Sequence, residues 1–327
     1  MLQTLLDLGK PLLADGATGT NLFDVGLTSG DNPELWNAAN PAKIRALHQS
    51  FVDAGADIIL TNSFGGNRRR LMLHDLQERG RELNALAAQH ARAVADASGR
   101  RVVVAGSVGP TGDLLAPLGP LTEEEAFEVF KEQIEGLKAG GVDVVWIETM
   151  SAPEEIRAAA RAAGALAMPY TITASFDTAG KTMMGVAPAA LAALIGELSP
   201  GPLAFGANCG VGAADLLMSV LGMSEAAPQA VIIAKANAGV PQWRGAHIHY
   251  SGTPELMGEY ADLALDAGAR IVGGCCGSKP AHLAAMRAAL DRHVAGKRPT
   301  LADVEAALGP LVAPPSSGAA PRARRRS

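Results

Sequence analysis

Three cysteines are the residues of this chain best suited to chemistry. Cys275 and Cys276 are adjacent, in the run from Gly273 to Gly277, and Cys209 precedes Cys275 by 66 residues. Neighbouring side chains of an extended strand point to opposite faces, so adjacent thiols converge only where flanking glycines let the backbone bend. The pattern predicts a metal site or a reactive-thiol site. Three small buried cysteines are the alternative that the spacing leaves open, because free cysteine often packs like an apolar residue.

Zinc is the metal that such a site would favour. Thiolates are soft ligands that select zinc, and a catalytic zinc has three protein ligands and one open position. The spacing of Cys209, Cys275 and Cys276 is not that of a zinc finger. A zinc ion with an open position can bind a substrate thiol and lower its pKa, so that the nucleophilic thiolate forms at neutral pH. The cysteines thus indicate chemistry on a thiol.

Two further groups suit a thiol that is also an amino acid. Glu148 ends the apolar run 144–147, where an unpaired carboxylate would be unfavourable, so it requires an ion pair or a ligand contact. It can pair with an ammonium group. The backbone N–H groups around Asp15–Gly16 and Ser107–Val108 can receive a carboxylate. We therefore expect substrate contacts at Glu148, Asp15, Gly16, Ser107 and Val108.

Repeated strand and helix units must position these residues. From Pro11 to about Ala295, short apolar runs alternate with longer amphipathic segments, which predicts βα repeats. Runs such as Ala139–Asp143 read as a helix end, a glycine cap and a strand start. Strands are expected at 11–15, 56–62, 101–107, 142–149, 169–176, 202–208, 231–237 and 269–275. Helices are expected at 41–54, 66–97, 122–139, 153–164, 187–197, 211–222, 253–267 and 279–294.

Eight strands and eight helices predict a single-domain α/β fold, the (β/α)8 TIM barrel. A doubly wound open sheet is the alternative, because periodicity does not show whether the first and last strands pair. In a barrel the active site lies at the carboxyl ends of the strands, and all three cysteines follow strands. The expected domain covers residues 1–308. Residues 309–327, rich in Pro, Ala, Ser and Arg, are expected to form a disordered basic tail.

Composition excludes several classes of function. The chain of 327 residues is 48% hydrophobic and 19% charged, with a net charge of −5, so it lacks the basic signature of a nucleic-acid-binding protein. No apolar run reaches the roughly 18 residues that span a membrane, and the first ten residues do not resemble a signal peptide. We expect a cytoplasmic protein. An odd number of cysteines in a reducing compartment argues against disulfides, and the apolar excess leaves room for a homo-oligomer interface.

The motifs at the strand ends, taken in order over about residues 11–295, resemble the homocysteine S-methyltransferase family. They are Asp15–Gly16, Thr18–Thr20, Thr61–Phe64, Gly109–Thr111, Glu148–Thr149, Gly206–Cys209 and Gly273–Gly277. The chain is most similar to the compact bacterial betaine-homocysteine methyltransferases, with the homocysteine domain of cobalamin-dependent methionine synthase as a near relative. The resemblance implies a zinc-dependent barrel in which Cys209, Cys275 and Cys276 bind Zn2+. It also implies that Glu148 and the Asp15–Gly16 turn hold homocysteine.

The implied reaction is attack of the homocysteine thiolate on a methyl group of betaine, giving methionine and dimethylglycine. Aromatic rings stabilise quaternary ammonium groups, and Trp36, Phe64, Phe23 and Tyr250 are the candidates in this chain. The aromatic donor cage of the animal enzymes has no residue-by-residue counterpart here. Family members that use S-methylmethionine tend to carry Arg at the position of Gly277, so Gly277 argues against that donor.

Other functions compete with this one. The acceptor could be selenohomocysteine, and the donor could be S-methylmethionine, another sulfonium compound such as dimethylsulfoniopropionate, or a methyl-corrinoid on a separate protein. A phosphate-binding barrel lyase or isomerase with incidental cysteines is an alternative from another enzyme class, because glycine-rich strand exits can cradle phosphate. A zinc or thiol sensor is the non-enzyme alternative.

Overall fold

Eight parallel strands form one sheet, and each lies at a position expected from the sequence. The structure is a computed structural model and describes residues 1–244 and 247–312. The strands are β1 (Leu12–Leu13), β2 (Ile58–Leu60), β3 (Val103–Val108), β4 (Val144–Met150), β5 (Tyr170–Ala174), β6 (Ala204–Cys209), β7 (Ile232–Ala236) and β10 (Ala269–Gly274). Each is short and mostly buried, as expected for parallel strands that are covered on both faces.

The sheet closes into a barrel between β1 and β2. Neighbouring strands follow the order β1-β10-β7-β6-β5-β4-β3-β2. Across the remaining seam, Asp57 N–H donates to Leu13 O at 2.7 Å and Asp15 N–H donates to Ile58 O at 2.9 Å. The predicted (β/α)8 barrel is thereby confirmed. The open-sheet alternative is wrong, because its end strands would not be hydrogen-bonded to each other.

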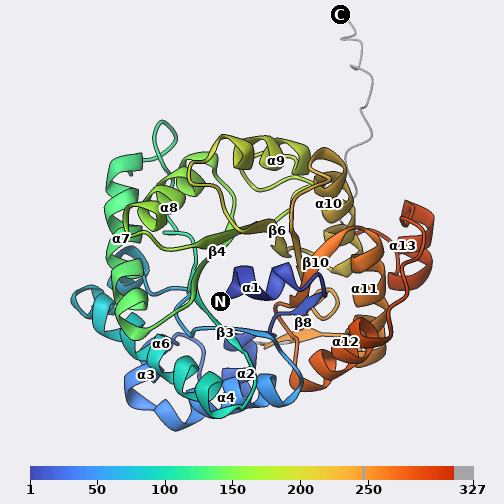
Figure 1. Ribbon diagram of the computed structural model, residues 1–327. Helices are drawn as coiled ribbons and strands as arrows, with labels where there is room; N and C mark the ends of the chain where they lie inside the picture. The colour runs from blue at the N-terminus through green and yellow to red at the C-terminus, as the bar shows by residue number, and fades with distance from the viewer. Residues whose placement is uncertain (245–246, 313–327) are drawn as a thin grey trace, which may run out of the picture.

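A ring of helices surrounds the barrel (Figure 1). Seven of the eight predicted helices are observed close to their expected bounds. They are α4 (Pro41–Asp53), α7 (Glu123–Gly140), α8 (Pro153–Ala165), α9 (Pro188–Glu197), α10 (Ala213–Ala226), α11 (Pro254–Asp266) and α12 (Pro280–Arg292). Proline begins several of these helices, and Thr122 caps α7 in a capping box with Glu125. These local signals explain why the starts could be predicted.

Residues 66–97 do not form the single helix that was predicted. The chain forms α5 (Arg68–Leu71), the 3-10 helices η1 (Met72–His74) and η2 (Gln77–Arg79), and then α6 (Gly80–Ala97). Asp75 has a left-handed backbone with a φ of 56°, which ends the first helical stretch. The alternation of arginine and apolar residues continues through this break. The prediction was wrong because that pattern carries no sign of the interruption.

Several short elements escaped the sequence analysis. They are α1 (Leu2–Asp7), α2 (Thr18–Asp24), α3 (Trp36–Ala39), α13 (Leu301–Leu308) and the hairpin of β8 (Pro241–Arg244) and β9 (His247–Tyr250). Most lie within the connections between barrel strands and helices, and α1 and α13 flank the repeats. Elements of this length are too short for hydrophobic periodicity to reveal them.

The first of these elements, α1, closes the amino end of the barrel. Its Leu2, Leu5 and Leu6 are buried against the inward-facing residues of the strands, among them Trp146 and Ile233. Figure 1 shows α1 across the centre of the ring of helices. Burial of three leucines removes apolar surface from water both on the helix and inside the barrel. The helix is therefore a plug for the barrel interior.

The interior is layered, and the layers place charged residues at the opposite, carboxyl end. Trp146 on β4 and Ile233 on β7 belong to the apolar interior. Side chains two residues apart on a strand share a face, so Glu148 and Lys235 point into the same interior, one layer nearer the carboxyl end. Both are buried. This polar layer lies between the apolar interior and the strand ends.

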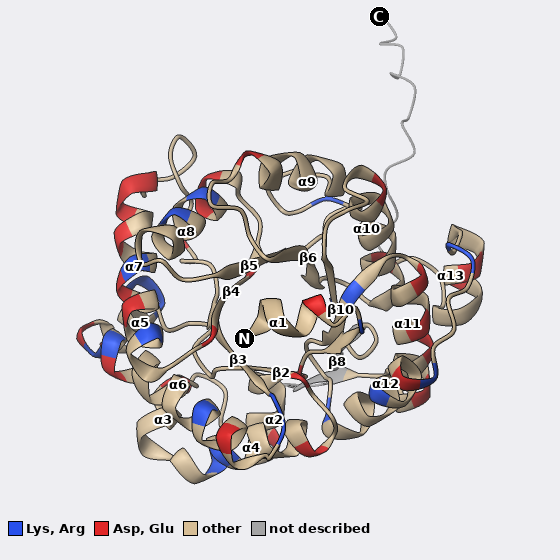
Figure 2. Ribbon diagram, in the orientation of Figure 1, with Lys and Arg blue, Asp and Glu red and all other residues tan. Residues whose placement is uncertain are grey.

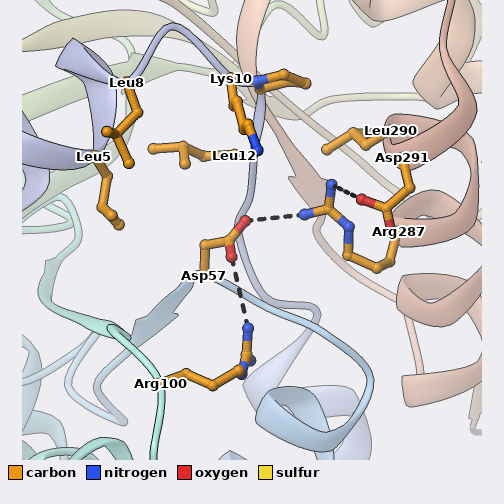
Figure 3. A pocket seen from close by; sticks show the side chains of 10 residues that line it. Leu5, Leu8, Lys10, Leu12, Asp57, Arg100, Arg287, Leu290 and Asp291 are labelled. Atoms are coloured by element: carbon orange, nitrogen blue, oxygen red, sulfur yellow. Dashed lines mark hydrogen bonds and ion pairs between the residues drawn. The ribbon is translucent and has the colours of Figure 1, made fainter.

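A hollow of about 570 Å³ lies beside α1 at the amino end (Figure 3). Asp57 stands at its centre and pairs with Arg287 at 3.0 Å and with Arg100 at 3.7 Å. Asp57 also accepts a hydrogen bond from Leu13 N–H at 2.9 Å. These contacts connect β1, the start of β2, the start of β3 and α12. The cluster therefore stabilises the barrel seam, at the end opposite the cysteines.

Acidic and basic residues are interspersed along the outer helices, as Figure 2 shows. Mixed charges of this kind suit a solvated surface. Within the described part of the chain, no helix has both the length and the apolar character that crossing a membrane requires.

The chain remains packed on the fold as far as Val312. Leu308 and Leu311 pack against the core, and Val312 N–H donates to a carboxylate oxygen of Asp215 on α10 at 3.0 Å. The first four residues of the predicted disordered tail therefore belong to the folded domain. The remaining residues, 313–327, lie outside the described part of the chain, and their disorder stays a prediction.

Candidate active site at the carboxyl ends of the strands

The three cysteines meet where β6 and β10 end. Their sulfur atoms all lie within 4.8 Å of one another, and Cys209 Sγ is 4.0 Å from Cys276 Sγ. Sulfurs around a tetrahedral zinc, each 2.3 Å from the ion, would be about 3.8 Å apart. The donor type and the spacing both fit one soft metal ion. The predicted convergence of Cys209, Cys275 and Cys276 is confirmed, and their binding of zinc stays a prediction.

The backbone turn begins at Cys275 and includes Cys276, rather than preceding the pair. β10 runs as a strand through Gly274, and Cys275 N–H donates to Ala236 O at 2.7 Å. The turn follows, because Ser278 N–H donates to Cys275 O at 3.1 Å and Gly277 has a left-handed φ of 79°. The bend that brings the thiols together therefore depends on Gly277.

Close packing accounts for the glycine before the pair. A Cβ atom on Gly273 would lie 3.0 Å from the Cβ of Ala14. Gly273 therefore lets β10 approach β1 closely. Cys209 reaches the cluster by another route, since its own backbone is left-handed, with a φ of 62°. Such a conformation is uncommon for a residue other than glycine and often marks a functional site.

Asn208 fixes one of the thiols. Its Nδ2 donates to Thr149 Oγ1 at 2.8 Å and lies 3.8 Å from Cys275 Sγ. Its Oδ1 accepts hydrogen bonds from Thr149 N–H at 2.9 Å and from Thr173 Oγ1 at 2.7 Å. The amide is therefore held on both sides and supports Cys275 in a fixed position.

The three thiols interact with one another. Hydrogen bonds to Cys275 and Cys276 raise the pKa of Cys209, and burial raises it further. Hydrogen bonds from Cys209 and Cys275 lower the pKa of Cys276 to about 3. One thiolate therefore accepts hydrogen bonds from two thiols. A soft cation would replace those two protons, so the cluster is suited to metal binding.

Glu148 is a buried carboxylate with one short hydrogen bond. It is 8% exposed, and Ser107 Oγ donates to its Oε1 at 2.5 Å. Burial raises the pKa of Glu148 from 4.5 to about 7, and the charges of Cys275 and Asp15 add to the rise. The positive charge of Lys235 opposes it. The carboxylate is thus only partly neutralised by the protein, which suits contact with a substrate ammonium group.

Lys235 pairs with Asp15 and was missed by the sequence analysis. Lys235 Nζ lies 2.8 Å from Asp15 Oδ1, and both side chains are almost completely buried. Asp15 Oδ2 accepts a further hydrogen bond from Leu60 N–H at 2.7 Å. The signal was present in the sequence, because Lys235 is a charged residue inside an otherwise apolar strand. Such a residue requires a buried partner.

Two backbone donors that were predicted to receive a carboxylate are already engaged. Asp15 N–H donates to Ile58 O at 2.9 Å, and Ser107 N–H donates to Thr61 Oγ1 at 3.0 Å. Both bonds connect neighbouring barrel strands. A substrate carboxylate would have to displace them, and a contact of these two N–H groups with a substrate stays a prediction.

Gly16 and Val108, the neighbours of these donors, have packing roles. A Cβ on Gly16 would lie 3.0 Å from both Leu283 Cδ1 and Ser278 O, so only glycine fits this close approach to the β10 loop. The Val108 side chain is fully buried in the apolar core outside the barrel. A contact of either residue with a substrate stays a prediction.

Two of the four aromatic candidates for contact with a donor cation, Trp36 and Phe64, are held by other groups, and a third, Phe23, is 51% exposed. Trp36 on α3 is 8% exposed, packs in a small apolar cluster, and has Lys43 Nζ 4.7 Å from its ring centre. Phe64 is partly exposed and lies against Gly109, whose Cβ would come within 2.6 Å of the ring. Their contact with a methyl donor stays a prediction.

Tyr250, at the end of β9, lies beside the thiols. Tyr250 lies close enough to Cys276 for its hydroxyl group and the thiol to interact. A Cβ atom on Gly277 would lie 2.3 Å from Tyr250 Cγ. Gly277 is therefore required both for its left-handed backbone and for the close approach of this ring.

Comparisons with known proteins agree with this arrangement. A family model described as homocysteine S-methyltransferase matches residues 12–290. Methionine synthase of Mycobacterium leprae (strain TN) is 30% identical over 308 residues, which are 89% of this chain and 25% of the relative. Methionine synthase of Mycobacterium tuberculosis (strain ATCC 25618 / H37Rv) is 30% identical over 298 residues, 86% of this chain and 25% of the relative. The chain thus spans about a quarter of these relatives.

A solved structure shares the fold over nearly its whole length. The metallated form of the homocysteine methyltransferase MmuM from Escherichia coli superposes with a TM-score of 0.71 and 26% identity, covering 88% of this chain and 99% of that chain. The family match runs from β1 into α12 and includes all three cysteines, Glu148 and Asp15. On this evidence the chain belongs to the homocysteine S-methyltransferase family.

Proposed function

We propose that this protein transfers a methyl group from betaine to homocysteine, with Zn2+ bound by Cys209, Cys275 and Cys276. Membership of the family supports the acceptor and the reaction class, and favours them over a phosphate-binding lyase or a sensor. The observation that carries the proposal is the convergence of three thiols within 4.8 Å at the carboxyl end of the barrel. Zinc held there would bind the homocysteine thiol and lower its pKa, making the thiolate available at neutral pH.

Glu148 is proposed to hold the ammonium group of homocysteine. The carboxylate is buried, and Lys235 and Ser107 only partly offset that burial. An ammonium group beside it would stabilise the ionised form and gain a charge-assisted hydrogen bond. Ser107 Oγ donates to Oε1, so it orients the carboxylate and leaves Oε2 for the substrate.

The proposed step needs no acid or base from the protein. The thiolate sulfur forms a bond to the methyl carbon of betaine as the carbon–nitrogen bond breaks. The electron pair of that bond stays on nitrogen, which leaves as the neutral amine of dimethylglycine. The task of the chain is therefore to hold the sulfur, the methyl carbon and the nitrogen in line.

Tyr250 and Gly277 support betaine as the donor. The Tyr250 ring occupies the space beside Gly277 that a larger side chain would need, and its hydroxyl lies at Cys276. An aromatic ring next to the thiols can stabilise a quaternary ammonium group, whereas an Arg at position 277 would displace the ring. Gly277 and Tyr250 thus fit a permanently charged methyl donor, the class to which betaine belongs.

The test measures zinc content and then the products formed from homocysteine with each donor in turn. With betaine we expect one dimethylglycine for each methionine. S-methylmethionine as the true donor would give two methionines for each homocysteine consumed and no dimethylglycine. Methylation with S-methylmethionine alone would overturn the betaine assignment, and absence of methionine with every donor would overturn the proposed function.

A methyl-corrinoid donor should be tested together with betaine and S-methylmethionine, because two relatives are methionine synthases. A methylated corrinoid carried by a separate protein would then supply the methyl group. Methionine formed with methylcobalamin at a higher rate than with betaine would favour this donor.

A further inference from the structure

Lys235 is a buried cation in the side-chain layer that faces the thiols. The residue is 2% exposed, its Nζ lies 2.8 Å from Asp15 Oδ1, and the Trp146 ring centre lies 5.6 Å away. Burial of an ammonium group is unfavourable unless its charge is paired and its donors are satisfied. The proposed methyl transfer does not involve this charge.

The ammonium group of Lys235 has more N–H donors than its hydrogen bond to Asp15 uses. A lysine carries three N–H donors, and within the described residues the hydrogen bond of Nζ goes to Asp15. Glu148 lies near enough for its charge to interact with that of Lys235. A negative and a positive side chain therefore stand close together in one layer, next to the cysteine cluster.

An α-amino acid needs such a pair of charges. Its ammonium and carboxylate groups are attached to the same carbon atom, so a site that binds both must present an anion and a cation side by side. Two of the predicted carboxylate receptors, the N–H groups of Asp15 and Ser107, are engaged within the barrel wall. Lys235 is the cation that the same layer offers instead.

We propose that Lys235 binds the α-carboxylate of the acceptor thiol and so selects an amino-acid thiol over simple thiols. The inference rests on the proposed function, in which Glu148 takes the ammonium group. Asp15 acts through Lys235, because its carboxylate holds the lysine ammonium in place. Lys235 is therefore a specificity-determining residue, and Asp15 is a positioning residue.

The competing explanation gives Lys235 a purely structural role as the counter-ion of Asp15. Both explanations predict that replacement of Lys235 harms the enzyme. They differ in the acceptor, because a structural role is indifferent to the carboxylate of the substrate. Homocysteamine, which is homocysteine without its carboxylate, separates them.

The experiment measures KM and kcat of the zinc-loaded enzyme for homocysteine and for homocysteamine, in the wild type and in Lys235→Met. The loss of a charged hydrogen bond predicts that the homocysteine KM rises roughly 10- to 100-fold in the variant, while the homocysteamine KM changes little. The preference for homocysteine is then lost. An equal rise for both thiols, or an unchanged preference, would overturn the inference.

Two further variants keep the result interpretable. Lys235→Met leaves the buried Asp15 carboxylate without its partner, so the double variant Asp15→Asn/Lys235→Met removes both charges. This variant should also lose the preference for homocysteine, and retention of the preference would contradict the inference. Lys138, exposed on α7 and bonded to Leu166 O at 2.7 Å, is the matched control. Lys138→Met should keep the preference.

Calorimetric binding of the two thiols to the same zinc-loaded proteins separates this inference from the proposed function. Failure of the wild type to methylate homocysteine with any donor would overturn the function. The binding preference still tests Lys235 in that case. A wild-type preference that disappears in Lys235→Met supports the inference, and a preference that persists contradicts it.

Discussion

Among single residues, Glu148 lowers the stability of the folded protein when it is ionised, yet the ionised form is the one proposed to bind substrate. Its pKa in the folded protein is raised to about 7 from 4.5, mainly by burial. A carboxyl group whose pKa rises on folding destabilises the folded state when it is ionised, and this effect disappears below the ordinary pKa. A shift of this size corresponds to about 3 kcal/mol above pH 7. The ionised form is also the one that an ammonium substrate requires.

Replacement of Glu148 by Gln should therefore stabilise the substrate-free protein and weaken homocysteine binding. We expect the free energy of unfolding at pH 7.5, in the metal-free protein, to rise by about 1–3 kcal/mol. The homocysteine KM should rise roughly 10- to 100-fold because a charged hydrogen bond is lost. Denaturant unfolding and steady-state kinetics measure the two effects. Glu197→Gln, at an exposed position on α9, should change neither quantity.

An unchanged homocysteine KM in Glu148→Gln would remove the proposed ammonium contact. A loss of stability would contradict the unfavourable burial of the charge.

His48 on α4 should make the fold sensitive to acid. The ring is 1% exposed, and its two nitrogens have no hydrogen-bond partner among the described residues. Burial, with a smaller effect from the charge of His90, lowers its pKa from 6.5 to about 4. The unfolded chain therefore binds a proton at a higher pH than the folded protein. Stability is unaffected above pH 6.5 and falls as the pH drops towards 4.

The variant His48→Leu should lose this part of the acid sensitivity. The wild type should lose up to about 3 kcal/mol between pH 6.5 and pH 4 through this residue, and the variant should not. Chemical denaturation across this pH range measures the difference. His74→Gln, at an exposed site, is the control and should keep the wild-type slope. Parallel pH profiles for wild type and His48→Leu would show that His48 is protonated equally in both states.

The charged residues of the site were only partly predictable from the sequence. Glu148 was found because a carboxylate at the end of an apolar strand requires a partner. Lys235 carries the same signal on β7, yet its partner Asp15 lies 220 residues away. Trp36 and Phe64 were chosen for their aromatic character, but the direction of a side chain in a loop depends on contacts with other segments. The sequence shows which residues are charged, but it does not show which of them form ion pairs.

Among the elements, the short helix α1 closes one end of the barrel interior. It fills the amino end with Leu2, Leu5 and Leu6, while Leu8, next to its end, is 62% exposed. No periodicity could reveal a helix of six residues, and the need for a plug arises only once the barrel is closed. The helix predicted over 66–97 failed in the opposite way, because local pattern continued across a break that tertiary contacts impose.

Truncation of the plug should affect stability and leave catalysis intact. Leu2→Ala removes a side chain that is 1% exposed, so the free energy of unfolding should fall by about 2–4 kcal/mol. Leu8→Ala should change it by less than about 0.5 kcal/mol because the side chain is solvated. The value of kcat should stay within about twofold of the wild type at a temperature where both variants are folded. Equal stability losses for the two variants would contradict the plug.

At the scale of the whole molecule, the sequence predicted the eight strands, seven of the helices and the convergence of the cysteines. Glycine caps, proline helix starts and apolar strands are local signals, and a barrel has few ways to connect them. The closure itself depends on pairs such as Leu13 and Asp57, which are distant in sequence. The connections that shape the site, including the β8–β9 hairpin with Tyr250, are specified by tertiary contacts.

The seam should depend on Asp57. Its carboxylate accepts from Leu13 N–H and pairs with Arg287 and Arg100. Asp57→Ala leaves a strand N–H and two guanidinium groups without this acceptor, so we expect a loss of about 1–3 kcal/mol in the free energy of unfolding. Asp53→Ala, at the exposed end of α4, should cost less than about 0.5 kcal/mol. Urea unfolding compares them, and equal losses would show that the seam does not rely on the Asp57 cluster.

The proposed function requires that three cysteines bind one zinc ion and that the homocysteine thiol then binds the same ion. X-ray absorption at the zinc edge, recorded on the purified zinc-loaded protein before and after homocysteine is added, measures the number of sulfur ligands. We expect three sulfur neighbours at about 2.3 Å, rising to four when homocysteine is present. A sulfur count that does not change on addition of homocysteine, or a zinc ion with fewer than three sulfur neighbours, would contradict the proposed function.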